Sequence, residues 1–136
     1  MSLLLDTNVC IALINESSEK VRNRFSRALA TETEVFVSSI AIFELWFGVF
    51  RSSRVRFNSD RLEAFLKAPL SILPFEDDDA RTAGVIHAGL QLAGLPIGSY
   101  DVLLAGHAVN RGLTLITANV SEFSRVKDLS WQDWNN

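Results

Sequence analysis

The apolar residues of the chain form short continuous runs, and between these runs lie longer segments with helical spacing. Four runs of three or four residues are rich in Leu, Ile and Val, which is typical of strands buried on both faces. They cover residues 3–5, 35–37, 71–73 and 113–116. Because helices are predicted between them, we expect an α/β fold with a central, mostly parallel β-sheet flanked by helices on both faces.

The helical segments are marked by apolar residues three and four positions apart and by residues that favour helix ends. Ser17 and Ser18 precede the segment 19–30 and can accept hydrogen bonds from its first turn. Acidic residues begin the segment that starts at Asp77, and Gly94 follows its end. The predicted helices cover residues 9–14, 19–30, 39–51, a segment that begins at Asp60 with Glu63 completing a capping box, 77–91, and 100–110 before Gly112.

Length and composition limit the class of protein. The chain has 136 residues, of which 48% are hydrophobic and 21% charged. It contains no repeat or linker, so we expect one domain over residues 1–136. No segment is suited to spanning a membrane, and the first residues lack the basic region of a signal peptide. Cys10 is the only cysteine, which excludes an internal disulfide and predicts a core residue in a cytoplasmic protein.

Three carboxylates occur in apolar surroundings, where charged residues are uncommon. Asp6 ends the first apolar run, Glu44 is the only charged residue from 40 to 50, and Asp101 begins a helix with small and apolar residues on the same face. The carboxyl ends of parallel strands form the ligand-binding edge of such sheets, so we expect Asp6 and Glu44 on one rim. The alternatives are a solvent-facing Glu44 and an Asp101 that only compensates the helix dipole.

Converging carboxylates predict a metal site. Two unit charges ~4 Å apart repel by roughly 4 kcal/mol at an effective dielectric constant near 20. A hard divalent cation removes this repulsion, and sites made of oxygen ligands suit Mg²⁺, with Mn²⁺ as a substitute. His87 and His107 are not placed to join the acids, so we expect core or surface histidines rather than zinc ligands. No phosphate-binding loop or nucleophile-elbow motif occurs.

Several stretches, taken together and in order, resemble a PIN-domain protein and, more closely, the VapC-type toxins of bacterial toxin–antitoxin pairs. They are LLLDTN at 3–8, SSIAIFEL at 38–45, LPIGSYDVLLAGHA at 95–108, LITANVSEFSRV at 115–126 and LSWQDW at 129–134. The similarity covers essentially the whole chain. It implies a PIN-like fold and a Mg²⁺-dependent endoribonuclease that a cognate antitoxin holds inactive.

The resemblance assigns catalytic and metal-binding roles to Asp6, Glu44 and Asp101. On this assignment Asp6 and Asp101 bind the metal directly, whereas Glu44 either binds it or orients the attacking water. Many PIN domains have a fourth acid where this chain has Asn119, so one and two metal ions are both open alternatives. An Asn side chain can still offer a carbonyl oxygen or orient a water. The residues expected to support the metal ligands through hydrogen bonds are Asn119, Thr7 and Ser99.

Arginines that follow the helix of Glu44 are candidates for binding RNA phosphates. The net charge of -3 argues weakly against a nucleic-acid-binding protein, but the clustering of cations matters more than the total. A solvated face is the alternative for each cluster. The expected RNA-binding residues are Arg51, Arg54 and Arg56, with Arg61 beside them and a second cluster at Lys20, Arg22, Arg24 and Arg27.

The helix of Glu44 also carries Trp46, Phe47 and Phe50, a surplus of aromatic residues for one helix. They either belong to the core or form an exposed groove for an antitoxin helix or a second protomer. The expected partners are therefore an RNA substrate, a cognate antitoxin and a second copy of the chain in a homodimer.

Two other classes of protein compete with the ribonuclease. A haloacid-dehalogenase-like phosphatase also begins with an apolar strand that ends in Asp. Its chemistry needs a second Asp two residues later, where this chain has Asn8. A non-catalytic PIN-fold binding module is the other alternative, and the presence of all three acids argues against it.

Overall fold

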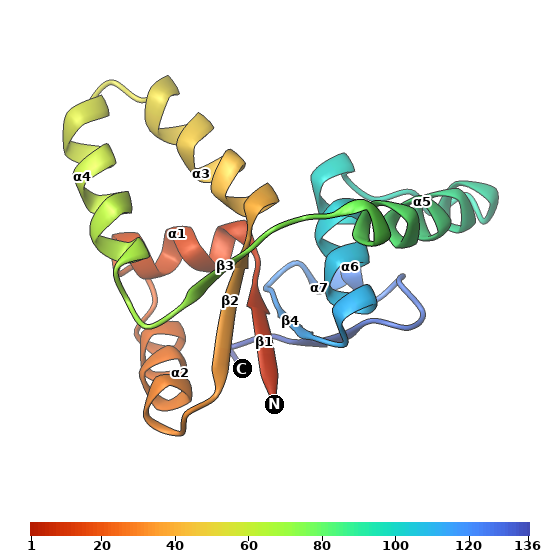
Figure 1. The fold of residues 1–136 in the computed structure, drawn as a ribbon, viewed down its shortest axis with the longest axis horizontal. Coiled ribbons are helices and arrows are strands. Elements are labelled where there is room, and N and C mark those ends of the chain that lie inside the picture. Colours follow the sequence, from red (N-terminus) through yellow and green to blue (C-terminus); the bar gives the residue numbers. More distant parts are fainter.

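The protein is described by a computed structural model that covers residues 1–136 (Figure 1). Five strands form one sheet in the order β3-β2-β1-β4-β5, and every neighbouring pair is parallel. The strands are β1 Ser2–Leu5, β2 Glu34–Ser38, β3 Ser71–Leu73, β4 Thr114–Ile116 and β5 Ser130–Gln132. The helices are α1 Thr7–Asn15, α2 Glu19–Ala30, α3 Ser39–Arg51, α4 Val55–Leu66, α5 Asp77–Leu92, α6 Ser99–Arg111 and α7 Val120–Phe123.

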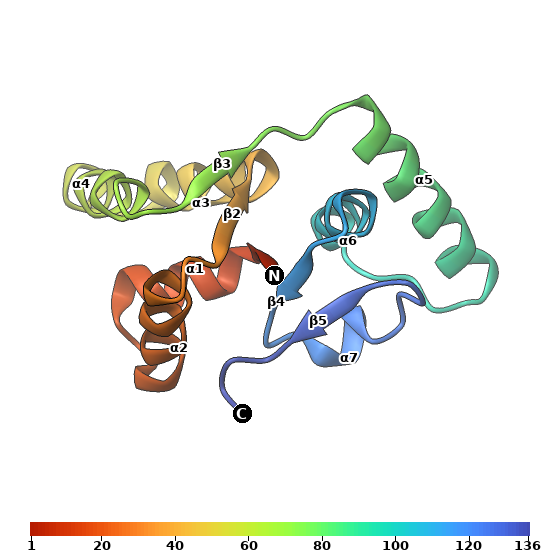
Figure 2. The ribbon, with the colours of Figure 1, turned by 60° about the horizontal axis from the view of Figure 1, so that its bottom comes forward.

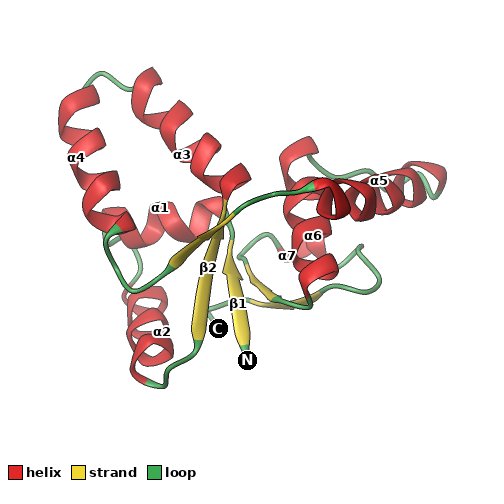
Figure 3. Ribbon diagram, in the orientation of Figure 1, coloured by secondary structure: helices red, strands yellow, loops and turns green.

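Both faces of the sheet are buried, as alternate residues of β1 demonstrate. Leu3 and Leu5 join a core with residues of α1 to α4, whereas Leu4 joins a second core with residues of α5 to α7. The ribbon shows this division, with α1 to α4 on one side of the central strands and α5 to α7 on the other (Figure 3). The predicted parallel sheet with helices on both faces is confirmed. Cys10 is fully buried in the first core, as expected.

The strand order creates a crevice at the carboxyl ends of β1 and β4. These strands are neighbours, although β2 and β3 lie between them in sequence and extend the sheet in the opposite direction. Open α/β sheets bind ligands at such a switch point. The Asp6 N–H donates to the Ile116 carbonyl at 3.0 Å, so Asp6 lies at this edge. The topology therefore supports the location predicted for Asp6.

Helix α5 forms an outer layer that packs mainly on α6 (Figure 2). The two helices approach closely because Gly106 of α6 has no side chain. A Cβ atom there would lie 2.5 Å from the Cα of Ala83 in α5. Gly106 therefore sets the distance between the two helices, and α6 carries Asp101 at its start.

Replacing Gly106 with Ala is expected to lower the free energy of unfolding by about 1–3 kcal/mol, because the added methyl group meets backbone that cannot move aside alone. Gly89→Ala is the matched control, since nothing lies within 4 Å of its added methyl group. That change should raise stability by about 0.5–1 kcal/mol. Urea unfolding of both variants tests this, and equal effects would show that the close helix contact does not matter.

Three local predictions are wrong. The helix expected to begin at Asp60 begins at Val55, because the arginine-rich segment is itself helical and buries Leu62 beneath it. The helix expected over residues 100–110 begins earlier, at Ser99, and Gly98 occupies its N-cap position. The strand β5, Ser130–Gln132, was not predicted, since two of its three residues are polar and only pairing with β4 defines it.

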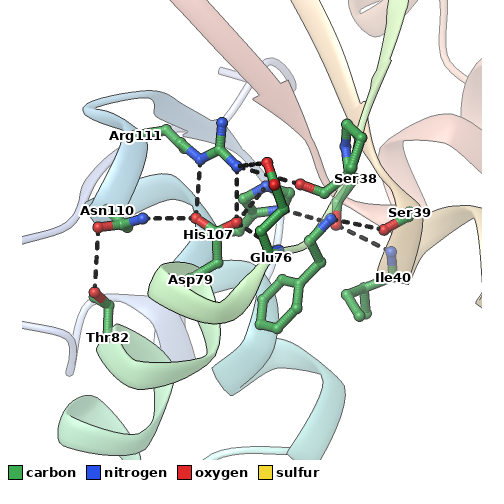
Figure 4. Close-up of polar contacts among 11 residues, drawn as sticks. Ser38, Ser39, Ile40, Glu76, Asp79, Thr82, His107, Asn110 and Arg111 are labelled. Carbon is green, nitrogen blue, oxygen red and sulfur yellow. Dashed lines mark hydrogen bonds and ion pairs between the residues drawn. The ribbon is translucent and has the colours of Figure 1, made fainter.

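A buried polar network ties α5 to α6 (Figure 4). The carboxylate of Asp79 is fully buried and accepts hydrogen bonds from Asn110 Nδ2 at 2.7 Å, Arg111 Nε at 2.9 Å and the Glu76 N–H at 2.8 Å. Burial alone would raise the pKa of Asp79. The bonds from Arg111, Asn110 and Glu76 outweigh it and hold that pKa well below its usual range.

The same network reaches the start of α3, the helix of Glu44. His107 is fully buried, and its Nδ1 lies 2.9 Å from the Ser38 hydroxyl. That hydroxyl accepts a hydrogen bond from the Ile40 N–H at 3.0 Å and so caps α3. Burial lowers the pKa of the His107 imidazole despite the nearby Asp79 carboxylate. His107 is therefore a core residue, as predicted, and it links the α5–α6 layer to the helix of Glu44.

Candidate active site

Asp6 is held rigidly at the junction of β1 and α1. It is 4% exposed and is the N-cap of α1, where its Oδ1 accepts a hydrogen bond from the Val9 N–H at 2.8 Å. Burial raises the pKa of the Asp6 carboxyl, and the nearby Glu44 charge adds to this, while hydrogen bonds from Thr117 and Val9 oppose it. Asp6 is thus a buried acid that the backbone holds in a fixed orientation at the edge of the sheet.

Glu44 faces Asp6 across the start of α1. It is half-buried on α3, and its Oε1 accepts a hydrogen bond from the Thr7 hydroxyl at 2.7 Å. Thr7 is the residue after Asp6, so one short segment fixes one acid and orients the other. The alternative of a solvent-facing Glu44 is therefore wrong, and Thr7 supports an acid as expected.

Asp101 is half-buried in the first turn of α6 and interacts with a fourth acid, Glu122. Asn119 Nδ2 donates to Asp101 Oδ2 at 3.3 Å and also to Glu122, which accepts a further hydrogen bond from the Gly98 N–H at 3.1 Å. Burial, the hydrogen bond to Glu122 and the charges of Glu122, Asp6 and Glu44 raise the pKa of Asp101 to about 7. Asp101 is therefore more than a residue that compensates the helix dipole.

Glu122 is a site residue that was not predicted from the sequence. Hydrogen bonding from Asn119 holds the pKa of the Glu122 carboxyl below its usual range, whereas the pKa of Asp101 is raised. A sequence signal existed, because Glu122 follows Asn119 at the spacing of a capping box, just after the carboxyl end of β4. Glu122 thus supplies a carboxylate beside Asn119, the position at which the resemblance predicts a fourth acid.

The three predicted acids line one pocket of about 340 Å³. They come from separate elements, since Asp6 precedes α1, Glu44 lies on α3 and Asp101 on α6. Arg51 lines the same pocket and forms no hydrogen bond or ion pair. The pocket therefore combines carboxylate oxygens, which suit a hard divalent metal ion, with the guanidinium group of Arg51, which suits a phosphate.

In this structure the acids do not form a complete set of metal ligands. As the side chains stand, no three acidic, histidine or cysteine side chains are grouped tightly enough to hold an ion. One oxygen of each carboxylate accepts a hydrogen bond, from the Val9 N–H to Asp6 Oδ1, from Thr7 to Glu44 Oε1 and from Asn119 to Asp101 Oδ2. The chemistry of these donors fits a hard divalent cation, which Asp6, Glu44 and Asp101 would hold.

The other candidate residues lie outside this pocket. Ser99 is exposed and lines a different hollow between α5 and α6, so it does not support the acids. Arg54 and Arg56 are exposed at the start of α4, and the Arg54 guanidinium carbon lies 3.9 Å from the centre of the Phe57 ring. Arg61 is structural, because its Nη2 donates to the Ile14 carbonyl at 2.6 Å.

The second basic cluster lies on α2, toward the amino edge of the sheet (Figure 1). Lys20 Nζ donates to the Asn135 carbonyl at 3.4 Å and Arg24 Nη1 to an Asn136 oxygen at 3.2 Å. These side chains therefore fasten the end of the chain to α2. Helix α2 leads into the amino end of β2, whereas α3, which carries Glu44, follows its carboxyl end (Figure 1).

The aromatic residues of α3 divide between partly buried and exposed positions. Trp46 is half-buried against the first core and stacks on Phe50 with 5.6 Å between ring centres. Phe47 and Phe50 are 56% and 66% exposed. Of the two alternatives, Trp46 follows the core and Phe47 and Phe50 form an exposed aromatic face on α3, and Phe47 also lines the acidic pocket.

Residues 3–129 match the PIN domain family, and the chain belongs to this family. Within it, the chain is similar over nearly its whole length to VapC ribonucleases. It is 35% identical over 134 residues to the tRNA(fMet)-specific endonuclease VapC of Salmonella typhimurium, with 98% of both chains covered. It is 34% identical over 135 residues to ribonuclease VapC2 of Rickettsia felis, with 99% of both covered.

Solved structures agree with these relatives. VapBC2 from Rickettsia felis, bound to a DNA fragment from its promoter, superposes with a TM-score of 0.92 at 33% identity, covering 98% of this chain and 99% of that one. DNA-bound VapBC from Salmonella typhimurium gives 0.90 at 35% identity, with 98% of each chain covered. The PIN-like fold and the resemblance to VapC-type ribonucleases are confirmed, and the haloacid-dehalogenase-like alternative is wrong.

None of the helices is both long enough and apolar enough to cross a membrane.

Proposed function

We propose that this protein is an endoribonuclease that depends on Mg²⁺, with Mn²⁺ as a substitute, and that it is the toxin of a toxin–antitoxin pair. The observation that carries the proposal is the pocket at the switch point of the sheet, where Asp6, Glu44 and Asp101 from three elements lie beside an unpaired Arg51. Family membership adds the class of reaction, since the similar proteins are named ribonucleases.

The role of each residue in the pocket follows from its surroundings. Asp6 and Asp101 would hold the cation, and Glu44, oriented by Thr7, would either complete its ligands or align the attacking water. A bound Mg²⁺ polarises a phosphoryl oxygen and lowers the pKa of a bound water. Asp101 would hold the cation as a carboxylate, and the hydrogen bond from Asn119, which also donates to Glu122, would keep that carboxylate in place. Arg51 would pair with a phosphate of the RNA.

The partners follow from the same family. The solved relatives are described as VapBC complexes. We infer that an antitoxin binds this chain, with the exposed aromatic face of α3 as one contact, and that the toxin forms a homodimer in the cytoplasm. One and two cations stay open as alternatives, because Glu122 offers a carboxylate near Asn119.

The proposal is tested by the chemistry of the cut. Purified chain, freed of antitoxin, is incubated with single-stranded and structured RNAs, with Mg²⁺ or with a chelator, and the product ends are mapped. Attack by water predicts cleavage that needs the cation and persists when the nucleotide at the cut carries a 2′-deoxy sugar. Cleavage in the chelator, or its loss with the 2′-deoxy substrate, would contradict metal-assisted attack by water. A chain that cuts no RNA at all would favour the non-catalytic binding module.

Replacing Arg54 and Arg56 together with Gln is expected to weaken RNA binding and reduce its dependence on salt. For each phosphate that is no longer neutralised, the slope of log K against log salt should become shallower by roughly 0.7 for single strands. Arg51→Gln should weaken binding further because Arg51 lies in the pocket itself. Arg22 and Arg27 of α2, changed to Gln, are the matched control. Unchanged affinity and slope in the first variant would make the segment a solvated face.

The stability of the metal-free protein should fall as pH rises. The pKa of Asp101 is about 7 in the folded state and ~3.9 in the unfolded chain, so its contribution is full below about pH 4 and is lost as pH passes 7. Glu122 opposes this in part because its pKa is lowered. Allowing for solvent screening, we expect a loss of about 1 kcal/mol, or roughly 4 °C in the thermal midpoint.

Two comparisons check this prediction by thermal unfolding from pH 4 to pH 8. Mg²⁺ should restore the midpoint at pH 8, because the cation binds only the folded state. Asp101→Asn should be neutral or stabilising without metal and should lack the fall. A clearly destabilised Asp101→Asn, together with a wild type that ignores Mg²⁺, would mean that Asp101 is a structural cap.

A further inference from the structure

Two exposed aromatic side chains stand at the acidic pocket and have no role in the proposed binding of metal and phosphate. Phe43 is 53% exposed and Tyr100 is 46% exposed. Phe43 immediately precedes Glu44 on α3, and Tyr100 immediately precedes Asp101 on α6. Both line the same pocket as the acids. The two helices that supply catalytic carboxylates therefore also supply an aromatic ring each.

The two rings form a pair that is open to solvent. Their centres are 5.6 Å apart and their planes are inclined at 54°, so neither ring covers the other. Exposed aromatic rings are costly to leave in water, and this pair lies outside both buried cores. The rings hold each other in place yet keep apolar surface free beside the carboxylates.

We propose that Phe43 and Tyr100 form a stacking subsite for one unpaired base of the RNA, next to the phosphodiester bond that is cut. The inference rests on the proposed ribonuclease function and adds the state of the substrate, which is single-stranded at this base. Bases in a duplex already stack on their neighbours, whereas an unpaired base can leave its strand and stack on Phe or Tyr.

The charges of the pocket favour a nucleotide as the occupant. Arg51 lines the pocket with no partner of its own, and its guanidinium carbon lies 5.3 Å from the centre of the Phe47 ring. A nucleotide presents the flat face of a base together with an anionic phosphate, and this hollow offers an aromatic pair, a cation and a set of acids that suits a divalent cation. An apolar protein segment would match only the rings and would leave Arg51 and the acids unpaired.

The first test uses an RNA whose cut has been mapped. Its single-turnover cleavage rate is measured as a function of protein concentration, which gives the affinity for the RNA. Phe43→Leu and Tyr100→Leu remove the rings but keep apolar volume, and each should weaken RNA binding about 5- to 100-fold. Tyr100→Phe should bind as the wild type does. Leu92→Ala is the control, because Leu92 is an apolar residue that is 90% exposed at the end of α5, outside the pocket. Thermal unfolding of every variant checks that it folds.

An abasic substitution in the RNA separates stacking from other effects. When the base that flanks the cut is removed, wild type and Tyr100→Leu should bind with the same affinity, since the stacking partner is gone from both. If the two proteins differ as much on the abasic RNA as on the intact RNA, or do not differ on either, the subsite is overturned.

A second test does not need cleavage. An RNA with 2-aminopurine at the flanking position is bound without metal to the Asp6→Ala protein, and its fluorescence should be quenched by stacking. Adding Tyr100→Leu should restore the fluorescence, while adding Leu92→Ala should not. Quenching by the Asp6→Ala protein, together with a wild type that cuts no RNA in any metal, would refute the nuclease while supporting the subsite. Normal cutting by the wild type, without quenching that depends on Tyr100, would support the nuclease and refute the subsite.

The same variants distinguish a protein contact. Sedimentation of wild type, Phe43→Leu and Tyr100→Leu should give the same distribution of oligomers if the rings serve RNA. Loss of self-association with unchanged RNA binding would assign the rings to a protein interface and overturn the proposal.

Discussion

Asp6→Asn is expected to lower the rate constant of RNA cleavage by at least about 10³-fold while leaving the protein folded. The carboxylate at this position would hold the cation, and a neutral amide is a much weaker ligand for a hard ion. The fold should survive because Asn caps a helix about as well as Asp, so the bond from the Val9 N–H to the side chain is kept. Single-turnover cleavage and circular dichroism measure the two parts.

The control for Asp6→Asn is Asp128→Asn, which removes an exposed acid far along the chain. Asp128→Asn should cleave at the wild-type rate. The double variant of Asp6 and Asp101 should be little slower than either single variant, because residues that serve one cation lose their effect together. A folded Asp6→Asn protein with near-normal cleavage would remove Asp6 from the active site.

Asp79→Ala is expected to lower the free energy of unfolding at pH 7 by about 3 kcal/mol. The substitution removes the acceptor at the centre of the α5–α6 network and leaves Arg111 and Asn110 without their buried partner. Asp77→Ala, an exposed acid in the same helical turn, should change stability by less than about 0.5 kcal/mol. Urea unfolding of both variants gives the comparison.

The pH dependence of this effect has a definite sign. The folded-state pKa of Asp79 is lowered below the unfolded value, ~3.9, so its stabilising contribution is present above about pH 4 and is lost as pH falls below that. The stability difference between wild type and Asp79→Ala should therefore stay constant from pH 5 to pH 7 and shrink in acid. A difference that grows in acid would contradict the lowered pKa.

Elements with strong local signals could be predicted from the sequence alone. The apolar run before Asp6 has no polar position to expose, so it had to be a buried strand, and helix α2 begins after the capping Ser18 as predicted. Elements defined by a distant partner could not be predicted. Strand β5 has a polar sequence and exists because Thr114 and Leu115 pair with it. The start of α4 was missed because Arg54 offers no side-chain cap.

The same distinction applies to the site. Asp6, Glu44 and Asp101 were found because each carboxylate interrupts an apolar setting, and the fold brings all three to one pocket. Glu122 was missed, since an acid among the polar residues in and around the short helix α7 carries no such contrast. Arg61 shows the opposite error, because its charge suggested RNA while its position on α4 commits it to the Ile14 carbonyl. Sequence pattern identifies unusual residues, but only the fold assigns their neighbours.

The central claim is that these acids act together through a divalent cation to cut RNA. Its most direct test is the single-turnover cleavage rate as a function of Mg²⁺ concentration, for wild type and Asp101→Asn prepared in parallel. We predict a wild-type rate that is absent in chelator and rises to saturation, and a variant rate that stays near background throughout. Wild-type cleavage in chelator, or overlapping curves for the two proteins, would contradict the claim.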